Sequence, residues 1–342
     1  MRTADFDYPL PEELIAQEAV ERGDSRMLVV DRQSGRTQHQ GIRDLSRWLR
    51  SGDLLLLNDT RVIAARLEAR RSTGRRFEVF LLEDEDGARW RGLVKPTSRA
   101  HPEEDLELSD GGSVRLERSL GEGVWDLTFN PPMDIERLDR IGATPLPPYI
   151  HRPDGPSSQD RERYQTVYAT EPGAIAAPTA GLHFDNALIG EVEAAGVEIA
   201  RLTLHVGIGT FRPVSVEQVA DHRMHSERFC FTEEAATAVN SAIGEGRRIV
   251  CVGTTSARAL EGALARGGGQ VLTGWDSTDI FITPGYDFQG VGALLTNFHL
   301  PKSTLLMMIS ALAGRERILD VYAEAVRERY RFFSFGDAML IV

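Results

Sequence analysis

The spacing of apolar residues changes character twice along the chain. Before residue 60, short apolar runs at 27–30 and 54–57 predict buried strands, and the apolar positions within 45–49 predict one face of a helix. Between residues 62 and 144, apolar and polar residues alternate in short segments that Gly, Asp and Ser turns separate. The first pattern is typical of an α/β domain, and closely spaced short strands without long helices are typical of a small β-barrel.

A proline-rich segment at residues 145–150 follows, and it predicts a stiff connection rather than a helix. A short helix over 134–141 is expected to lead into it. Beyond it the α/β pattern resumes, with strands predicted at 197–204, 248–252, 279–282 and 338–342 and helices at 187–195, 232–243, 254–266, 303–313 and 316–330. We therefore predict a discontinuous α/β domain, formed by residues 1–61 and 145–342, with residues 62–144 inserted as a small β-barrel domain.

Composition and charge constrain the partners. Of the 342 residues 42% are hydrophobic, and the formal net charge is −12, which as a whole repels nucleic acid. Binding to nucleic acid follows the local placement of Lys and Arg instead. One cluster is locally basic although the chain as a whole is acidic, and Glu68 is the single acidic residue within it. The cluster consists of Arg61, Arg66, Arg70, Arg71, Arg75 and Arg76. This cluster is either a strip that contacts phosphates or a solvated strand face.

Two further features bear on the compartment. No apolar run approaches the length of a membrane span, and the first ten residues do not resemble a secretion signal. Cys230 and Cys251 both fall in apparent strands, where they are expected as small buried residues rather than as a disulfide or a metal site. We expect a cytoplasmic protein without a membrane partner.

Three histidines lie in loops that suit an active site. His183 and His205 are flanked by glycine-rich sequence, and His299 lies just before a strongly apolar helix. Glycine permits close approach of the backbone to a ligand, and histidine can move protons near neutral pH. Asp59 follows a buried strand, where an α/β fold places active-site residues. The alternatives are structural: imidazoles that cap turns, and an ion pair between Asp59 and Arg61.

The segment around Gly253 follows an apolar strand and opens a helix. Free N–H groups, the hydroxyls of Thr254 and Thr255 and the positive helix end favour a carboxylate or phosphate there, with Arg258 one turn further on. An ordinary threonine N-cap is the alternative. The segment lacks the lysine and the glycine spacing of a P-loop, which argues against ATP hydrolysis.

Two other motifs are incomplete. Gly207 and Gly209 lack the third glycine of a dinucleotide fingerprint, so nicotinamide chemistry loses support. His222 and His225, followed by Glu227, lack the helical spacing of a zinc protease motif, and no third ligand is indicated. We therefore expect no metal site.

Read together, these segments resemble the S-adenosylmethionine:tRNA ribosyltransferase-isomerase family of queuosine biosynthesis. The matching segments span nearly the whole chain in family order: residues 6–11, 58–62, 145–150, 163–168, 177–184, 204–211, 222–227, 252–255, 278–286, 296–306 and 330–340. The chain departs from the usual family pattern at Ala19, Ala64 and Gly292, and in the barrel near residues 98–104.

The resemblance implies an α/β domain with an inserted β-barrel and a reaction that needs no metal. In that reaction S-adenosylmethionine donates its ribosyl carbons to the 7-aminomethyl-7-deazaguanine at the tRNA wobble position. Adenine and methionine leave, and epoxyqueuosine forms. The implied partners are S-adenosylmethionine, as a cosubstrate, and tRNA, and we expect the chain to act as a monomer.

This chemistry needs a base for the proton next to the sulfonium, an acid for adenine departure and donors for the sugar oxygens. His183, His205, His299 and Asp59 suit the proton transfers, and the sequence leaves open which histidine is the base. The predicted S-adenosylmethionine contacts are Gly207, Gly209, Gly253, Thr254, Thr255 and Arg258. The predicted contacts to tRNA phosphate or ribose are Arg61, Arg66, Arg152 and Lys302.

Two other function classes stay open. A conventional S-adenosylmethionine methyltransferase or a nucleoside hydrolase is the first, although a methyltransferase would need a Gly-rich strand-turn-helix fingerprint that is missing. A non-enzymatic RNA-binding module, using the barrel and its arginines, is the second. Such a module would not account for three histidine loops in the other domain.

Overall fold

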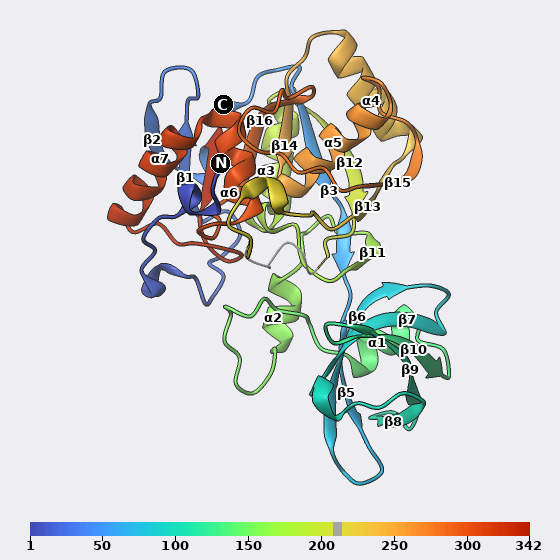
Figure 1. Ribbon diagram of the computed structural model, residues 1–342. Coiled ribbons are helices and arrows are strands. Elements are labelled where there is room, and N and C mark those ends of the chain that lie inside the picture. Colours follow the sequence, from blue (N-terminus) through green and yellow to red (C-terminus); the bar gives the residue numbers. More distant parts are fainter. Residues whose placement is uncertain (208–213) are drawn as a thin grey trace.

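The computed structural model describes residues 1–207 and 214–342, and it consists of an α/β domain and a small β-barrel that lies below it in Figure 1. Nine strands form one sheet in the order β15, β13, β12, β3, β14, β16, β17, β1, β2. Their bounds, in that order, are Gly274–Thr278, Glu227–Phe231, Glu198–Leu204, Leu54–Asn58, Ile249–Val252, Val291–Asn297, Ala338–Ile341, Arg26–Val30 and Thr37–Gly41. Strands β12, β3, β14 and β16 are parallel, so their carboxyl ends meet at one edge of the sheet.

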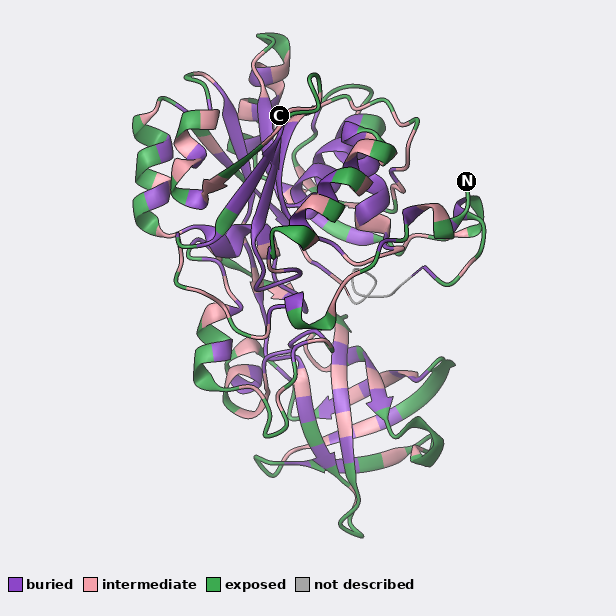
Figure 2. Cartoon of the chain, turned by 90° about the vertical axis from the view of Figure 1, so that its left-hand side faces the viewer, coloured by how far each residue is buried: buried purple, intermediate pink, exposed green. Residues whose placement is uncertain are grey.

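Helices cover both faces of this sheet. One face carries α4 (Glu233–Gly244), α5 (Thr254–Arg266), α6 (Thr304–Ala313) and α7 (Arg315–Arg327), whose apolar residues share a core with Leu54 and Leu56. The other face carries the short η3 (Ile42–Trp48) and α3 (Asn186–Ala194), which pack on Leu55 and Leu57. The central strands are buried along their whole length (Figure 2), because a strand covered on both faces exposes neither set of side chains.

The barrel closes in the strand order β10, β7, β6, β5, β8, β9, and all neighbouring strands are antiparallel. Its strands, in chain order, are Arg66–Arg70, Arg76–Asp84, Arg89–Lys95, Glu104–Leu108, Ser113–Gly121 and Val124–Asn130. In β6 the side chains of Phe77, Val79 and Leu81 are buried and alternate with more exposed residues. Figure 2 shows buried and more exposed residues alternating along the strands of the barrel. The strands lie inside the predicted insertion, 62–144; the domain limits themselves remain a prediction.

Short elements connect the two parts of the chain. β4 (Thr60–Val62) pairs in parallel with β11 (Glu171–Ala174), and α1 (Ile135–Ile141), capped by Asp134, leaves the barrel. α2 (Ser158–Arg163) follows the irregular proline-rich connection. The other short helices are η1 (Thr3–Phe6), η2 (Glu12–Leu14), η4 (Thr97–Arg99), η5 (Thr179–His183) and η7 (Val219–Asp221).

The predicted strand at 279–282 is wrong. The strand there, β15, lies earlier in the chain, and it is an edge strand on which Trp275 and Asp276 are exposed, so apolar content does not mark it. The backbone N–H of Ile280 donates to Oγ1 of Thr278 at 3.2 Å just after this strand ends, and Ile282 packs into the core outside any strand. The structure thus corrects the predicted position of this edge strand and confirms the predicted α/β fold class.

None of the helices in the described ranges is both long and apolar enough to cross a membrane.

Candidate active site

A cavity opens at the carboxyl ends of the parallel strands β14 and β16, where an open α/β sheet commonly binds its ligand. The cavity is small, with a volume of about 60 Å³, and it opens to solvent. The lining comes from six stretches of chain: Tyr149, residues 177–180, Val206, residues 253–255, residues 296–305 in part, and Phe333 with Ser334. The cavity therefore joins segments that are far apart in the sequence.

The start of α5 forms one wall of this cavity. Gly253 links β14 to the helix with a φ of 90°, a left-handed value that favours glycine. The first-turn N–H groups of Thr254 and Thr255 have no carbonyl to bind within the helix, and both residues line the cavity. The structure thus brings Gly253, Thr254 and Thr255 together as the sequence analysis expected, and their contact with a ligand stays a prediction.

Arg258 lies one turn further along α5 but does not line the cavity. Its guanidinium is buried and forms an ion pair with Glu227, which also accepts the N–H of Gly207 at 3.3 Å. This geometry gives Arg258 a structural partner, and its predicted contact with S-adenosylmethionine stays a prediction. Gly207 lies where the described chain after β12 ends, and the predicted contact Gly209 lies outside the described residues.

His299 is the predicted catalytic histidine that lines the cavity. Its Nε2 lies 2.8 Å from Oγ1 of Thr296, and its backbone N–H donates to the hydroxyl of Tyr322 at 2.9 Å. Burial lowers the pKa of the imidazole to about 3. His299 is therefore neutral at physiological pH.

His183 lies behind the cavity wall rather than on it. Nδ1 is 2.8 Å from Oγ of Ser25, and burial lowers the pKa of His183 to about 4, against a smaller opposite effect of the Asn297 amide. Within the described chain, neither Nε2 of His183 nor Oδ1 of Asn297 has a hydrogen-bond partner. The two side chains are neighbours, since the Asn297 amide affects the pKa of His183, and Asn297 itself lines the cavity.

His205 and Asp59 lie on the other side of the sheet edge. Successive residues of an extended strand point to opposite faces, so Val206 lines the cavity while His205 packs against Trp275, with ring centroids 5.2 Å apart. Asn58 likewise points toward Thr255 on the cavity side, and Asp59 points away from it. The structure therefore does not bring the four predicted catalytic residues together.

Each of these two residues has its own hydroxyl partners. The Nδ1 of His205 is 2.8 Å from Oγ1 of Thr60, and burial lowers the pKa of the imidazole to about 4. Asp59 accepts hydrogen bonds from the hydroxyls of Thr203, at 2.7 Å, and Thr170, at 3.2 Å. Burial raises the pKa of Asp59 despite these bonds.

The four predicted tRNA contacts all have acidic partners. Arg61 pairs with Asp139 at 3.5 Å, Arg66 with Glu78 at 3.2 Å and Lys302 with Asp7 at 2.7 Å. These three remain partly exposed and could exchange a carboxylate for a phosphate.

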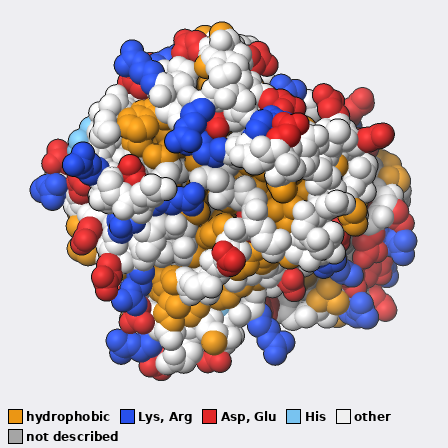
Figure 3. Space-filling view, turned by 90° about the horizontal axis from the view of Figure 1, so that it is seen from above, with side chains coloured by type: hydrophobic (Ala, Val, Ile, Leu, Met, Phe, Trp, Pro, Cys, Tyr) orange, Lys and Arg blue, Asp and Glu red, His pale blue; other side chains and the backbone are white. Residues whose placement is uncertain are grey.

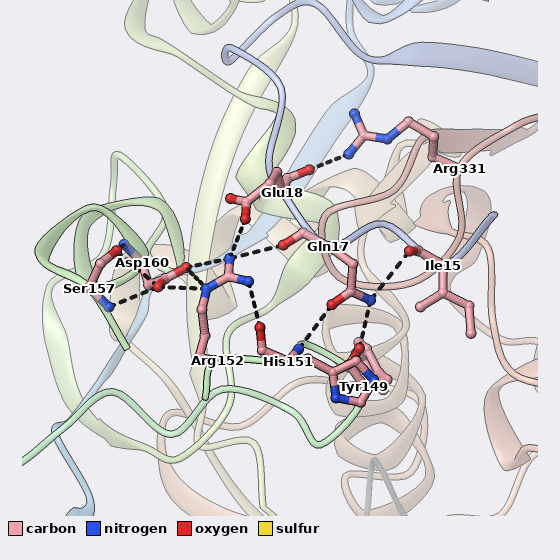
Figure 4. Close-up of polar contacts among 9 residues, drawn as sticks. All are labelled: Ile15, Gln17, Glu18, Tyr149, His151, Arg152, Ser157, Asp160 and Arg331. Carbon is pink, nitrogen blue, oxygen red and sulfur yellow. Dashed lines mark hydrogen bonds and ion pairs between the residues drawn. The ribbon is translucent and has the colours of Figure 1, made fainter. Parts of the chain in front are cut away.

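Arg152 is held more firmly, in the network of Figure 4. Its guanidinium lies 2.8 Å from Asp160 and 3.1 Å from Glu18, and it donates to the carbonyl of Gln17 at 2.9 Å. Only 17% of the side chain is exposed. Arg152 therefore ties the N-terminal segment to the proline-rich connection.

The arginine cluster of the barrel is also largely neutralised. Arg70 lies 2.8 Å and Arg76 3.6 Å from the same carboxylate oxygen of Glu68, and Arg71 pairs with Glu104 at 2.7 Å. Acidic and basic side chains are also interspersed at the end of the α/β domain away from the barrel (Figure 3). The cluster is better described as a solvated face of ion pairs than as a continuous phosphate strip.

Several cavity residues were not singled out from the sequence. Asn297 donates to the carbonyl of Phe333 at 2.9 Å, and the hydroxyls of Tyr149 and Ser334 are 2.6 Å apart. Phe333 has a φ of 71°, which is unusual for a large side chain and is held by these contacts. These residues lie in three segments that carry the family resemblance, 145–150, 296–306 and 330–340. The sequence alone does not show that these segments meet at one cavity.

No group of three or more His, Cys, Asp or Glu side chains that could hold a metal ion occurs among the residues that the structure describes. In the segment considered for a metal, His222 packs on Phe281 with ring centroids 5.1 Å apart.

We expect the free energy of unfolding to fall as the pH drops from about 6.5 toward 4. Because burial lowers the pKa values of His183 and His299, the folded protein binds fewer protons than the unfolded chain in this window. The contribution of each neutral, buried histidine to stability is therefore fully present above about pH 6.5, the pKa of histidine in the unfolded chain. It is lost as the pH falls below this value, by at most roughly 1.4 kcal/mol per pH unit for each histidine. Asp59 has the opposite effect on stability, because its raised pKa means that the folded protein binds this proton more tightly than the unfolded chain does.

Urea unfolding at a series of pH values measures this dependence. His183→Gln should make it shallower, and His101→Gln, at an exposed barrel position, should leave it unchanged. Equal pH dependence in the wild type and His183→Gln would contradict the neutral, buried state of this histidine.

Comparison with known proteins agrees with the resemblance seen in the sequence. The family model described as "Queuosine biosynthesis protein" matches residues 3–341. Proteins named S-adenosylmethionine:tRNA ribosyltransferase-isomerase are 53% identical in Symbiobacterium thermophilum and 51% identical in Geotalea uraniireducens, over the whole of this chain and of each relative.

A solved structure is also similar. The crystal structure of an S-adenosylmethionine tRNA ribosyltransferase from Thermotoga maritima is 35% identical in sequence, with a TM-score of 0.56 over 99% of this chain and 100% of that one. Both the sequence and the fold therefore match along the full length. The chain belongs to the queuosine biosynthesis protein family.

Proposed function

We propose that this chain is an S-adenosylmethionine:tRNA ribosyltransferase-isomerase. It transfers and isomerises the ribosyl group of S-adenosylmethionine onto 7-aminomethyl-7-deazaguanine at the tRNA wobble position, giving epoxyqueuosine, adenine and methionine. Family membership supports the reaction class. The single observation that carries the proposal is the cavity that combines a free helix N-terminus with a neutral histidine.

The start of α5 suits the methionine part of the substrate. A carboxylate is stabilised by the unpaired N–H groups and the positive end of a helix, and Thr254 and Thr255 add hydroxyls at that end. Apolar side chains elsewhere in the lining, Phe298, Leu300 and Leu305, suit the adenosyl part. The cavity therefore offers complementary chemistry to both ends of S-adenosylmethionine.

His299 is the proposed general base. The hydroxyl of Thr296 lies 3.3 Å from the carbonyl of Asn297, to which it donates, so its oxygen accepts from Nε2–H of His299. This arrangement leaves Nδ1 as the unprotonated nitrogen. Because burial lowers the pKa of this imidazole, Nδ1 carries no proton at neutral pH, and we assign it the proton from the carbon next to the sulfonium.

The bond changes then balance without a further reactant. The amine nitrogen of the RNA base loses a proton and bonds to a ribosyl carbon, while the glycosidic bond to adenine and the carbon–sulfur bond to methionine break. A new carbon–carbon bond joins the two ribosyl carbons that lose these leaving groups, and the ring oxygen moves to form the epoxide. Methionine leaves with the carbon–sulfur electron pair as a neutral thioether, one proton passes to adenine, and the remaining proton passes to solvent. We propose that His183 supports this site by positioning Asn297. His205 and Asp59 lie outside this cavity, so no proton transfer is assigned to them.

Product analysis tests this proposal. Purified protein is incubated with S-adenosylmethionine and with tRNA that carries the aminomethyl-deazaguanine, and the small molecules are separated by chromatography. We expect adenine and methionine in equal amounts, only when the modified tRNA is present. S-adenosylhomocysteine as the product would indicate a methyltransferase, and no consumption of the sulfonium would favour a non-enzymatic RNA-binding module.

A further inference from the structure

The sheet face next to His205 carries an exposed aromatic side chain. Thr203 of β12, Cys230 of β13 and Trp275 of β15 lie opposite one another in the strand register, so their side chains share one face. The apolar side chains of α4 and α5 pack on the opposite face. Trp275 is 48% exposed, and it is the one aromatic residue of the described ranges that is classed as exposed.

Neighbouring side chains pack against the indole of Trp275 despite this exposure. His205 packs against it at an interplanar angle of 31°, and the imidazole is in turn backed by Gly173, where an added Cβ would come within 2.7 Å of the ring. The guanidinium of Arg228 lies 5.0 Å from the indole centroid, within cation–π distance. His205 and Arg228 thus pack against Trp275 while much of the indole remains open to solvent.

The charges on this face differ from those of the barrel. Arg201 and Arg228 are both exposed, and within the described chain neither has a carboxylate at ion-pair distance. Two carboxylates lie near this face, Asp59 and Glu171, and both affect Cys230. Asp59 is engaged by the hydroxyls of Thr203 and Thr170, and the charge of Arg201 has a smaller effect on its pKa. In a chain of net charge −12, one arginine at the exposed indole and a second on the same face of β12, both without an ion-pair partner among the described residues, suit an anionic, aromatic ligand.

We propose that this surface, the Trp275 platform (Arg201, His205, Arg228 and Trp275), binds an unpaired nucleobase of the RNA substrate. The base stacks on the indole, and the arginines bind the phosphates on either side. Single-stranded RNA is recognised by this combination of aromatic stacking and cationic groups. This inference rests on the proposed function, since it takes the nucleobase from a tRNA loop.

The platform lies one residue from the cavity along the same strand end. Because Val206 lines the cavity and His205 belongs to the platform, a base stacked on Trp275 is bound at the edge of the sheet that also carries the proposed reaction site. The platform therefore gives the RNA a second point of attachment, independent of the nucleotide that reacts.

Binding of an anticodon stem-loop RNA, measured by fluorescence anisotropy without S-adenosylmethionine, tests this inference. Trp275→Ala should weaken binding about tenfold or more, which corresponds to the loss of one stacked base, and Trp275→Phe should restore most of it. A fully paired RNA duplex should bind the wild type and Trp275→Ala alike. Equal affinity of the wild type and Trp275→Ala for the stem-loop would overturn the proposal.

The arginines have a separate readout and a matched control. Arg201→Ala/Arg228→Ala should reduce the slope of log affinity against log salt concentration by about 1.4, since each phosphate contact to single-stranded RNA contributes about 0.7. Arg70→Ala/Arg76→Ala, which removes two arginines paired with Glu68, should leave the slope unchanged. The reverse result would place the RNA on the barrel. Failure of the wild type to release adenine would refute the proposed function without changing these binding results.

Discussion

His299→Gln is expected to lower kcat by a hundredfold or more. Removal of a general base typically has an effect of this size, and His299 is the candidate base that lines the cavity. Glutamine keeps a polar side chain of similar length that can still bond to Thr296, so the fold should persist. Steady-state release of adenine at saturating substrates measures the effect, and circular dichroism checks the fold.

The pH dependence sharpens this test. Because burial lowers the pKa of His299 to about 3, kcat of the wild type should show no titration near 6.5, the ordinary value for histidine. His101→Gln, on an exposed part of the barrel, serves as the matched control and should keep the wild-type rate. A His299→Gln variant that turns over at the wild-type rate would remove this residue from the mechanism.

Arg258→Met is expected to lower the free energy of unfolding by about 3–5 kcal/mol, the usual cost of removing one member of a buried ion pair. Arg258 and Glu227 are 5% and 6% exposed, so the Glu227 carboxylate would stay buried after it loses the Arg258 guanidinium. Urea denaturation measures the change. Arg70→Met, which breaks an exposed pair with Glu68, should cost less than about 1 kcal/mol.

A double variant separates this structural role from contact with a ligand. Arg258→Met/Glu227→Gln removes both charges and should recover a large part of the lost stability. If Arg258→Met is as stable as the wild type but binds S-adenosylmethionine weakly, Arg258 is a ligand contact after all.

Much of the fold was predictable because strong local signals agree with the tertiary structure. The bounds of α5, Thr254–Arg266, match the prediction, since a glycine precedes the helix and another follows it. The buried strand β3 is marked by four consecutive leucines. The edge strand β15 was misplaced because a strand open to solvent on one face keeps no continuous apolar run.

The site was predictable in part, for a different reason. The residues around Gly253 and His299 meet because their strands are parallel neighbours, a relation that follows from the fold class. The separation of His205 and Asp59 from this cavity depends on the alternation of side chains at the strand ends, which an uncertainty of one residue reverses. The barrel arginines seemed nearly unopposed because Glu78 and Glu104 come from neighbouring strands.

The central claim, ribosyl transfer, is tested most directly by the origin of the carbons that the tRNA gains. Two samples of S-adenosylmethionine, one labelled with carbon-13 throughout the ribose and one labelled in the methyl group, are each incubated with the protein and the aminomethyl-deazaguanine tRNA. Mass spectrometry of the digested tRNA should then show all the ribose label in the modified nucleoside and none of the methyl label. Label from the methyl group alone, or no gain in mass, would contradict the account.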